Sequence, residues 1–202
     1  MSGAPWSDAI VLAAGESVPA RPFTDPEATV HDLDVLAAIR TAQREHIAES
    51  HAGGTWIDQD GATHWLVAPR PELVVDPAPC LAVGFFGQAR SDVDHAIIVS
   101  LEHAMLVRAP QIPGFLAYHN VQLENAQWGN LVLFEVGTDT APLRADPTHA
   151  DAIGRAPAHY HSVRLHRGAL ARGAGNAEEI ELATTLYIDF DTPPSWRALR
   201  TN

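Results

Sequence analysis

Residues 146–167, DPTHADAIGRAPAHYHSVRLHR, join a short helix directly to a strand, and the rest of the fold can be predicted outward from this pair. Asp146 is a good N-cap and Pro147 suits the first helical position, so we expect the helix to begin there. Pro157 ends it. His149 is therefore expected in the first turn of the helix.

The strand that follows, 159–167, has two faces because successive side chains point to opposite sides of a sheet. The aliphatic pair Val163 and Leu165 predicts that their face is the core face. The other face is then left for a cavity or for water. Its side chains are Tyr160, Ser162, Arg164 and His166.

The apolar pattern upstream predicts four further elements of the same unit. They are a strand at 81–87, a helix at 92–107 and strands at 115–123 and 128–136. The resulting βαββαβ order is that of a ferredoxin-like unit, so we predict an α+β fold. Helices on one sheet face leave the other to be covered, and a second sheet would make a dimeric α+β barrel. A last strand at 182–190 extends the sheet or crosses to a partner.

The first part of the chain, 1–79, predicts an extension made of a strand, a helix and a hairpin. An apolar run at 9–14 predicts the strand, and Asp32 is expected to cap a helix over 32–50. This order is either an added arm or a partial second ferredoxin-like unit. It leaves open a pseudo-tandem barrel within one chain and a homodimer. Residues 80–192 form the predicted main unit and 193–202 a tail.

The hairpin of this extension is predicted from one dipeptide. Asp60-Gly61 lies between two short runs of strand-forming residues and is typical of a two-residue turn. In that register Trp56 lies opposite Trp65, and such a pair is usually a structural clamp.

Composition excludes several classes of function. The 202 residues carry a net charge of −12 and a pI near 5.2, which argues against nucleic acid and anionic membranes as partners. All 13 basic residues are arginine, so no lysine can form a Schiff base. One cysteine, Cys80, cannot make an internal disulfide. With no signal-peptide pattern and no apolar run of about 20 residues, we expect a cytoplasmic protein.

The helix-strand stretch resembles the aldoxime dehydratase family of haem-containing dehydratases. In that family a His-Pro-Thr-His run ends in the proximal haem ligand, and an Arg-Leu-x-His run ends in the distal acid. The resemblance also touches the strand at 81–88, which ends in Gly-Gln, and covers about half the chain, 80–190. The corresponding runs are Asp146-Pro147-Thr148-His149 and Arg164-Leu165-His166.

The resemblance implies a haem b cofactor and a small-molecule substrate, an oxime dehydrated to a nitrile. His149 would bind the iron, His166 would be the distal acid, and Arg164 and Ser162 would orient the leaving oxygen. Phe86 stands where the family has a serine that helps bind the oxime hydroxyl, and its bulk indicates a more apolar pocket.

Arg21 lies in the proline-containing arm that precedes the first helix. Its guanidinium could reach a carboxylate of the ligand or a haem propionate, and otherwise it is a solvated loop arginine.

Two alternatives remain open from sequence. The same fold could act without haem as a cofactor-independent monooxygenase or cyclase, with Trp128, Asn120 and Arg164 around an aromatic substrate. It could also be a non-catalytic haem-binding protein in which His149 is the ligand and His166 is idle. Either His119 or Asn120 is expected to face the cavity.

Overall fold

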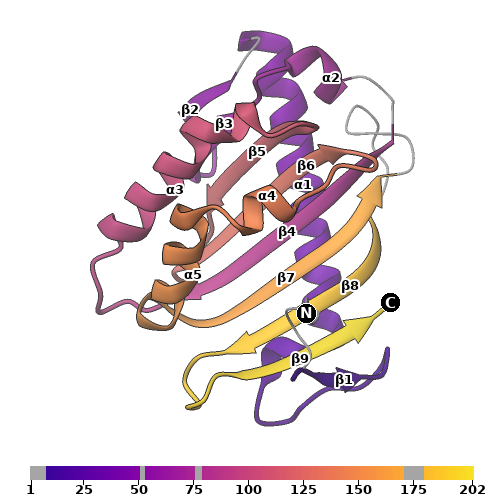
Figure 1. The fold of residues 1–202 in the computed structure, drawn as a ribbon, viewed down its shortest axis with the longest axis vertical. Coiled ribbons are helices and arrows are strands. Elements are labelled where there is room, and N and C mark those ends of the chain that lie inside the picture. Colours follow the sequence, from indigo (N-terminus) through magenta and orange to yellow (C-terminus); the bar gives the residue numbers. More distant parts are fainter. Residues whose placement is uncertain (1–7, 51–52, 76–78, 171–179) are drawn as a thin grey trace.

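The computed structural model describes residues 8–50, 53–75, 79–170 and 180–202 (Figure 1). Within these residues the strands form one nine-stranded sheet, in the order β1-β9-β8-β7-β4-β6-β5-β3-β2. The strands are β1 (Ile10–Leu12), β2 (Gly53–Ile57), β3 (Thr63–Val67), β4 (Cys80–Ala89), β5 (Phe115–Gln122), β6 (Gln127–Glu135), β7 (Tyr160–Leu170), β8 (Glu181–Asp189) and β9 (Trp196–Thr201). The α-helices are α1 (Pro26–Ser50), α2 (Pro71–Val75), α3 (Ala96–Arg108), α4 (Ala141–Arg144) and α5 (Pro147–His159), with short 3-10 helices η1 (Pro22–Thr24) and η2 (Ala109–Gln111).

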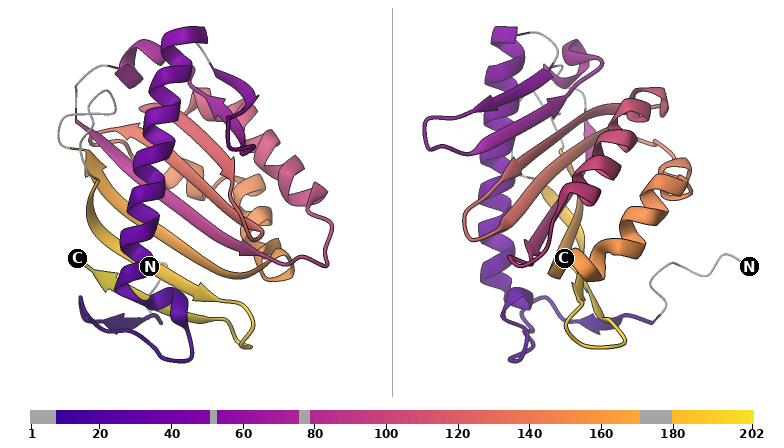
Figure 2. Two further views of the ribbon diagram at one scale, coloured as in Figure 1. Left: turned by 180° about the vertical axis from the view of Figure 1, so that it is seen from behind. Right: turned by 90° about the vertical axis from the view of Figure 1, so that its left-hand side faces the viewer.

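The centre of the sheet is the predicted ferredoxin-like unit. Its elements follow in the order β4-α3-β5-β6-α5-β7, and its strands lie side by side as β7-β4-β6-β5, each antiparallel to its neighbour. Helices α3 and α5 contact each other on one face of the sheet (Figure 2). The prediction of an α+β fold is confirmed. β4 lies in the middle of the sheet, and its first residue, Cys80, is only 1% exposed.

The other face of the sheet is crossed by α1, which Figure 2 shows on the side away from α3 and α5. Leu36, Ile39 and Ile47 of α1 are buried there. Gly84 of β4 allows this approach, since a Cβ at that position would lie 2.7 Å from Leu36 Cδ1. We expected a second sheet to cover this face, but a helix of the same chain lies on it instead.

Helix α1 also starts earlier than predicted. It begins at Pro26, after Asp25, whose side chain accepts the backbone N–H of Glu27 at 2.9 Å. This Asp-Pro start is the same signal that begins α5, and Asp32 is therefore not the N-cap. Asp32 lies inside the helix and is 1% exposed.

Both ends of the chain extend the same sheet. β3 pairs with β5, while β9 pairs with β8 and, in parallel, with β1. The first 79 residues therefore contribute strands to both edges of the sheet. The prediction of a tail at 193–202 is wrong, because Trp196–Thr201 is β9.

The hairpin register differs from the prediction by one residue. Trp56 pairs with His64, and Thr55 pairs with Trp65. The connection is longer than a two-residue turn, because Asp58 Oδ1 accepts the N–H of Ala62 at 2.8 Å and the Asp58 N–H donates to the Ala62 carbonyl at 3.0 Å.

Among the described helices, none is both long and apolar enough to cross a membrane.

Candidate functional site

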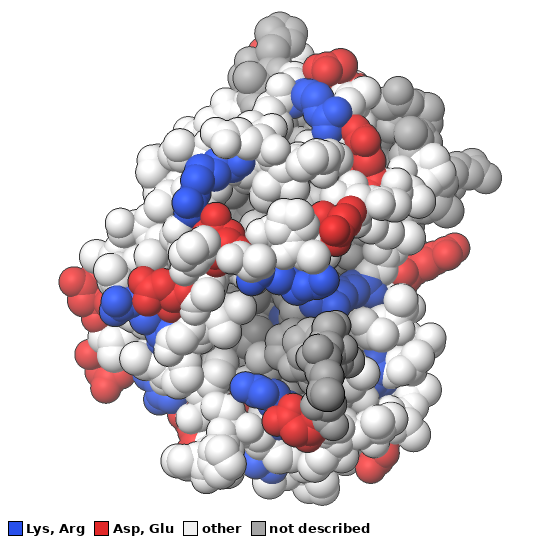
Figure 3. All heavy atoms as spheres, viewed as in Figure 1, with Lys and Arg blue, Asp and Glu red and all other residues white. Residues whose placement is uncertain are grey.

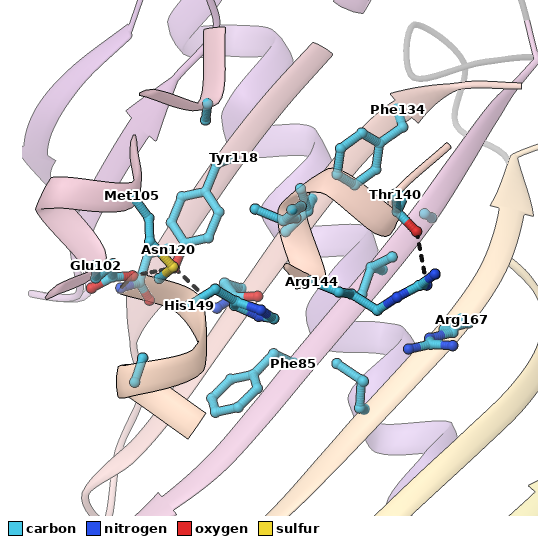
Figure 4. A pocket seen from close by; sticks show the side chains of 18 of the residues that line it. Phe85, Glu102, Met105, Tyr118, Asn120, Phe134, Thr140, Arg144, His149 and Arg167 are labelled. Atoms are coloured by element: carbon cyan, nitrogen blue, oxygen red, sulfur yellow. Dashed lines mark hydrogen bonds between the residues drawn. The ribbon is translucent and has the colours of Figure 1, made fainter. Parts of the chain in front are cut away.

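A cavity of about 780 Å³ lies between α3, α4 and α5 and the sheet beneath them (Figure 4). Small side chains leave this space open because they do not fill the gap between helix and strand. They are Ala152 and Ala156 on α5 and Gly168 and Ala169 on β7. The apolar walls include Val83 and Phe85 of β4, Met105 of α3 and Phe134 of β6. The sheet and the helices thus enclose a pocket suited to a largely apolar molecule.

His149 enters this cavity from the first turn of α5. The helix begins as predicted, since the Asp146 side chain accepts the backbone N–H groups of Thr148 at 2.8 Å and of His149 at 3.3 Å. Nδ1 of His149 is buried and has no hydrogen-bond partner among the described residues. Burial lowers the pKa of His149, and the backbone carbonyl of Arg144 only partly opposes this. The ring is therefore neutral near pH 7, which is the form that binds metals.

Two arginines line one end of the cavity. Arg144 at the end of α4 donates to Thr140 Oγ1 at 3.1 Å, and Arg167 of β7 lies beside it (Figure 4). Burial lowers the pKa of Arg167, and the charge of Arg144 lowers it further. Within the described part of the chain neither guanidinium has an acidic partner. Figure 3 shows basic side chains gathered near the centre of this face of the molecule. This end of the cavity is therefore suited to the acid groups of a ligand.

In another part of the cavity wall, the carboxyl group of Glu102 is the centre of a hydrogen-bonded cluster. Glu102 of α3 accepts hydrogen bonds from the Tyr118 hydroxyl and, at 2.7 Å, from Asn120 Nδ2, both on β5. Asn130 of β6 donates to the Tyr118 hydroxyl at 3.0 Å. Burial raises the pKa of Glu102, although the hydrogen bonds from Tyr118 and Asn120 lower it in part. A carboxyl group of this kind can carry a proton at a higher pH than a free glutamate.

Sequence reasoning missed Glu102, although a signal was present. It is the one acidic residue in α3, and it follows Ile98 by four positions and precedes Met105 by three. Both of these apolar residues line the cavity with it. An acid on the apolar side of a helix is costly unless it is hydrogen-bonded or has a function.

The three residues predicted as catalytic lie on the opposite face of the sheet. Arg164 and His166 of β7 point toward α1, where Arg164 Nη2 donates to Asp32 Oδ1 and His166 Nε2 contacts Asp32 Oδ2, each at 2.8 Å. His166 Nδ1 contacts Thr185 Oγ1 at 3.0 Å. Ser162 is buried and does not line the cavity. The expectation that His149 and His166 face one cavity is therefore wrong.

The reason is the alternation of side chains along β7. In the family run the histidine follows the arginine by three positions, whereas His166 follows Arg164 by two. One residue less turns the side chain to the other face of a strand. The residue three positions after Arg164 is Arg167, and it does line the cavity.

Two other predicted ligand contacts also lie elsewhere. Arg21 forms an ion pair with Asp189 at 2.8 Å and lies over the Trp196 ring at 4.3 Å. Phe86 is 2% exposed and packs edge-on against His166, while its neighbour Phe85 faces the cavity. Neither Arg21 nor Phe86 can contact a ligand in this pocket.

Only some of the residues named for the haem-free alternative line the cavity. Asn120 and Trp128 line the cavity, but Arg164 does not. His119 lies on the α1 side, where its Nε2 contacts His64 Nδ1 at 3.0 Å, and burial lowers the pKa of His119 to about 3. Of the pair left open by the sequence, Asn120 is the cavity residue.

Among the described residues, no group of three or more histidine, cysteine, aspartate or glutamate side chains is placed to hold a metal ion. A haem iron needs only one protein ligand, so this arrangement is compatible with His149 alone. Comparisons with protein-family models, with curated proteins and with solved structures gave no significant match to this chain.

Proposed function

We propose that the cavity binds haem b with His149 as the protein ligand of the iron, and that the protein dehydrates a small oxime-like N–O substrate there. The observation that carries the proposal is the neutral, half-buried His149 ring, whose buried Nδ1 has no partner among the described residues. It lies in an apolar cavity of about 780 Å³. Cofactor sites span about 300–1,000 Å³, so the size is suitable.

Different parts of the cavity lining suit different parts of the haem group. Apolar walls such as Phe85 and Phe134 match the macrocycle, and Arg144 and Arg167 match its two propionates by charge. The backbone carbonyl of Arg144 lies near the imidazole, and a carbonyl that accepts a hydrogen bond from one ring nitrogen is the usual kind of group that orients a haem-binding histidine. Nδ1, which has no partner among the described residues, is then the nitrogen left for the iron. Bound haem would supply an iron atom that holds the oxime nitrogen and draws electron density from it.

Reconstitution of the full chain with haemin tests this proposal directly. We expect a Soret band that titrates to one haem per chain and that is lost in the His149→Ala variant. A matched control is His31→Ala, because His31 is exposed on α1, away from the cavity. A wild-type protein that stays colourless, or a Soret band unchanged by His149→Ala, would overturn the proposal.

The second candidate is a cofactor-independent monooxygenase or cyclase. It is favoured by Asn120 and Trp128, which contribute an amide and an indole to the wall of the cavity. The same reconstitution decides between the two candidates, since this one predicts no Soret band and oxygen consumption with an aromatic substrate alone.

We propose a cytoplasmic protein, as expected from the sequence, and a homodimer, which the sequence left open beside a pseudo-tandem barrel within one chain. Size-exclusion chromatography with light scattering measures the assembly, and a mass of one chain would contradict the dimer.

A further inference from the structure

Resting on the proposed function, we propose that Glu102 is the acid that protonates the leaving hydroxyl of the oxime, while Asn120 Oδ1 accepts a hydrogen bond from that hydroxyl. Tyr118 is the positioning residue that fixes the Glu102 carboxyl. This assignment replaces His166, which Asp32 holds on the far face of the sheet.

Glu102 is the better placed of the two acids that line the cavity. Glu181 also lines it but is exposed to water, whereas Glu102 is half-buried between α3 and β5. Both hydrogen bonds to Glu102 fall on Oε1. Its second oxygen, Oε2, has no hydrogen bond to any described residue and can therefore serve a ligand.

Asn120 supplies an independent observation. Its side chain is 7% exposed, and its Oδ1 is a buried acceptor with no partner among the described residues. An unmatched acceptor in a cavity wall costs about 1–3 kcal/mol, and an O–H or N–H donor on a ligand would relieve that cost. Asn120 Nδ2 is held by Glu102 at 2.7 Å, so the orphan acceptor lies next to the carboxyl group.

The groups that face this cluster favour a protonated carboxyl. Burial raises the pKa of Tyr118 well above its usual range and that of Tyr160 to about 12, so neither phenol ionises near pH 7. His149 is neutral for the reason given above. No described positive charge contacts Glu102, and nothing there offsets its burial except two neutral hydrogen bonds.

The reaction balances with Glu102 as the only proton carrier. The proton on Glu102 passes to the hydroxyl oxygen of R-CH=N-OH, and the N–O bond breaks with its electron pair leaving on water. The electron pair of the C–H bond becomes the second π bond of the nitrile. The released proton returns to the Glu102 carboxylate, so no oxidant or reductant is consumed.

The test uses the full chain reconstituted with haemin, reduced with dithionite and supplied with butyraldoxime or phenylacetaldoxime. We expect Glu102→Gln to keep the Soret band and to lose nitrile formation by about 100-fold or more, the usual contribution of a general acid. Glu124→Gln, at an exposed loop position, is the matched control and should match wild type. The infrared carbonyl band of a protonated carboxyl group should persist in wild type to a higher pH than for a free glutamate, and should be absent in Glu102→Gln.

Each outcome is decisive. A wild type without a Soret band overturns both the haem proposal and this inference. A wild type with a Soret band but without nitrile overturns the dehydratase and Glu102 assignments, and leaves haem binding intact. Turnover by Glu102→Gln within about threefold of wild type, or no loss of the carboxyl band, overturns the role of Glu102 alone.

Tyr118→Phe keeps the inference testable if Glu102→Gln fails to fold. The Tyr118 hydrogen bond lowers the pKa of Glu102, so its removal should raise that pKa. The fall of kcat with rising pH should then move to higher pH. A pH profile identical to that of wild type would contradict the assignment, since a purely structural tyrosine would not move it.

Discussion

Two clusters of buried polar groups, on opposite faces of the sheet, differ in how far their hydrogen bonds are satisfied. On the α1 face, Asp32 is bound by Arg164 and His166, and His166 also contacts Thr185, so the buried charges are paired. On the cavity face, His149 Nδ1 and Asn120 Oδ1 have no partner among the described residues. A network in which every buried polar group has a partner is explained by its contribution to stability. Polar atoms without a partner in a cavity wall instead indicate a ligand. Gln43 of α1 and Nδ1 of His119 also have no partner among the described residues, but neither residue lines the cavity. An unmatched polar atom therefore points to a ligand only where it faces a cavity.

Removal of the Asp32 side chain should lower the free energy of unfolding more than any of the other substitutions. A small change would contradict the contrast between the paired cluster on the α1 face and the unmatched groups of the cavity. Burial alone would raise the pKa of Asp32, but hydrogen bonds and charges of His166 and Arg164 lower it overall. Asp32→Ala leaves Arg164 buried without its anion, which should cost about 3–5 kcal/mol in the free energy of unfolding. Urea denaturation measures this. Asp34→Ala, exposed on the same helix, should change it by less than about 0.5 kcal/mol.

The pH dependence of stability should follow His119 on the α1 face. Its pKa is lowered to about 3, so the folded state keeps a neutral ring while the unfolded state gains a proton near pH 6.5. Stability is therefore complete above that pH and falls as the pH drops toward 3, by up to about 1.4 kcal/mol per pH unit. His119→Leu should reduce this slope in urea titrations between pH 7 and 4. An unchanged slope would show that His119 titrates normally in the folded protein.

Gly84→Ala probes how closely α1 packs against the sheet. The added methyl group would lie 2.7 Å from Leu36 Cδ1, and overpacking of a core costs about 1–3 kcal/mol. Thermal unfolding should show a lower midpoint. The matched control is Gly154→Ala on α5, where an added Cβ would meet nothing within 4 Å apart from the backbone of its own helix. Here a gain of up to about 1 kcal/mol is expected from helix propensity. Equal behaviour of the two variants would contradict the close packing.

Substitution of Arg167, at the arginine end of the cavity, should have the smallest effect, and it should act on the affinity for haem. We expect Arg167→Gln to weaken haem binding by about tenfold, or about 1.4 kcal/mol, because one charged partner of the propionates is lost. Haem dimethyl ester should bind wild type and Arg167→Gln equally, since its acid groups are blocked. Arg155→Gln, exposed on α5 and paired with Asp151, is the control. Spectroscopic titration measures each affinity, and equal loss with the ester would show that Arg167 acts through packing.

Much of the fold could be predicted from local patterns. The βαββαβ order followed from apolar periodicity, and Asp146-Pro147 marked the start of α5 and placed His149 in its first turn. The same type of start at Asp25-Pro26 was overlooked, so Asp32 was mistaken for a cap. Strand β9 was missed because its short run of alternating residues lies beyond a proline-rich loop.

The site could be predicted only in part, for a physical reason. β7 is covered on both sides, so an aliphatic face does not identify the core as opposed to an apolar cavity. Leu165 lines the cavity, and the polar face of the strand meets α1. Asp32, which makes that face buried, lies 132 residues before Arg164, and no local pattern records such a pairing. Glu102 was visible as an acid on an apolar helix side, but its partners on β5 were not.

The single thiol on the central strand gives the molecule a built-in reporter. Since Cys80 is sealed within the sheet, a sulfhydryl reagent added to the intact protein can modify it only during transient opening. The rate of labelling would thus compare variants in plain buffer, without chemical denaturants, and ligand binding should slow it in proportion to occupancy.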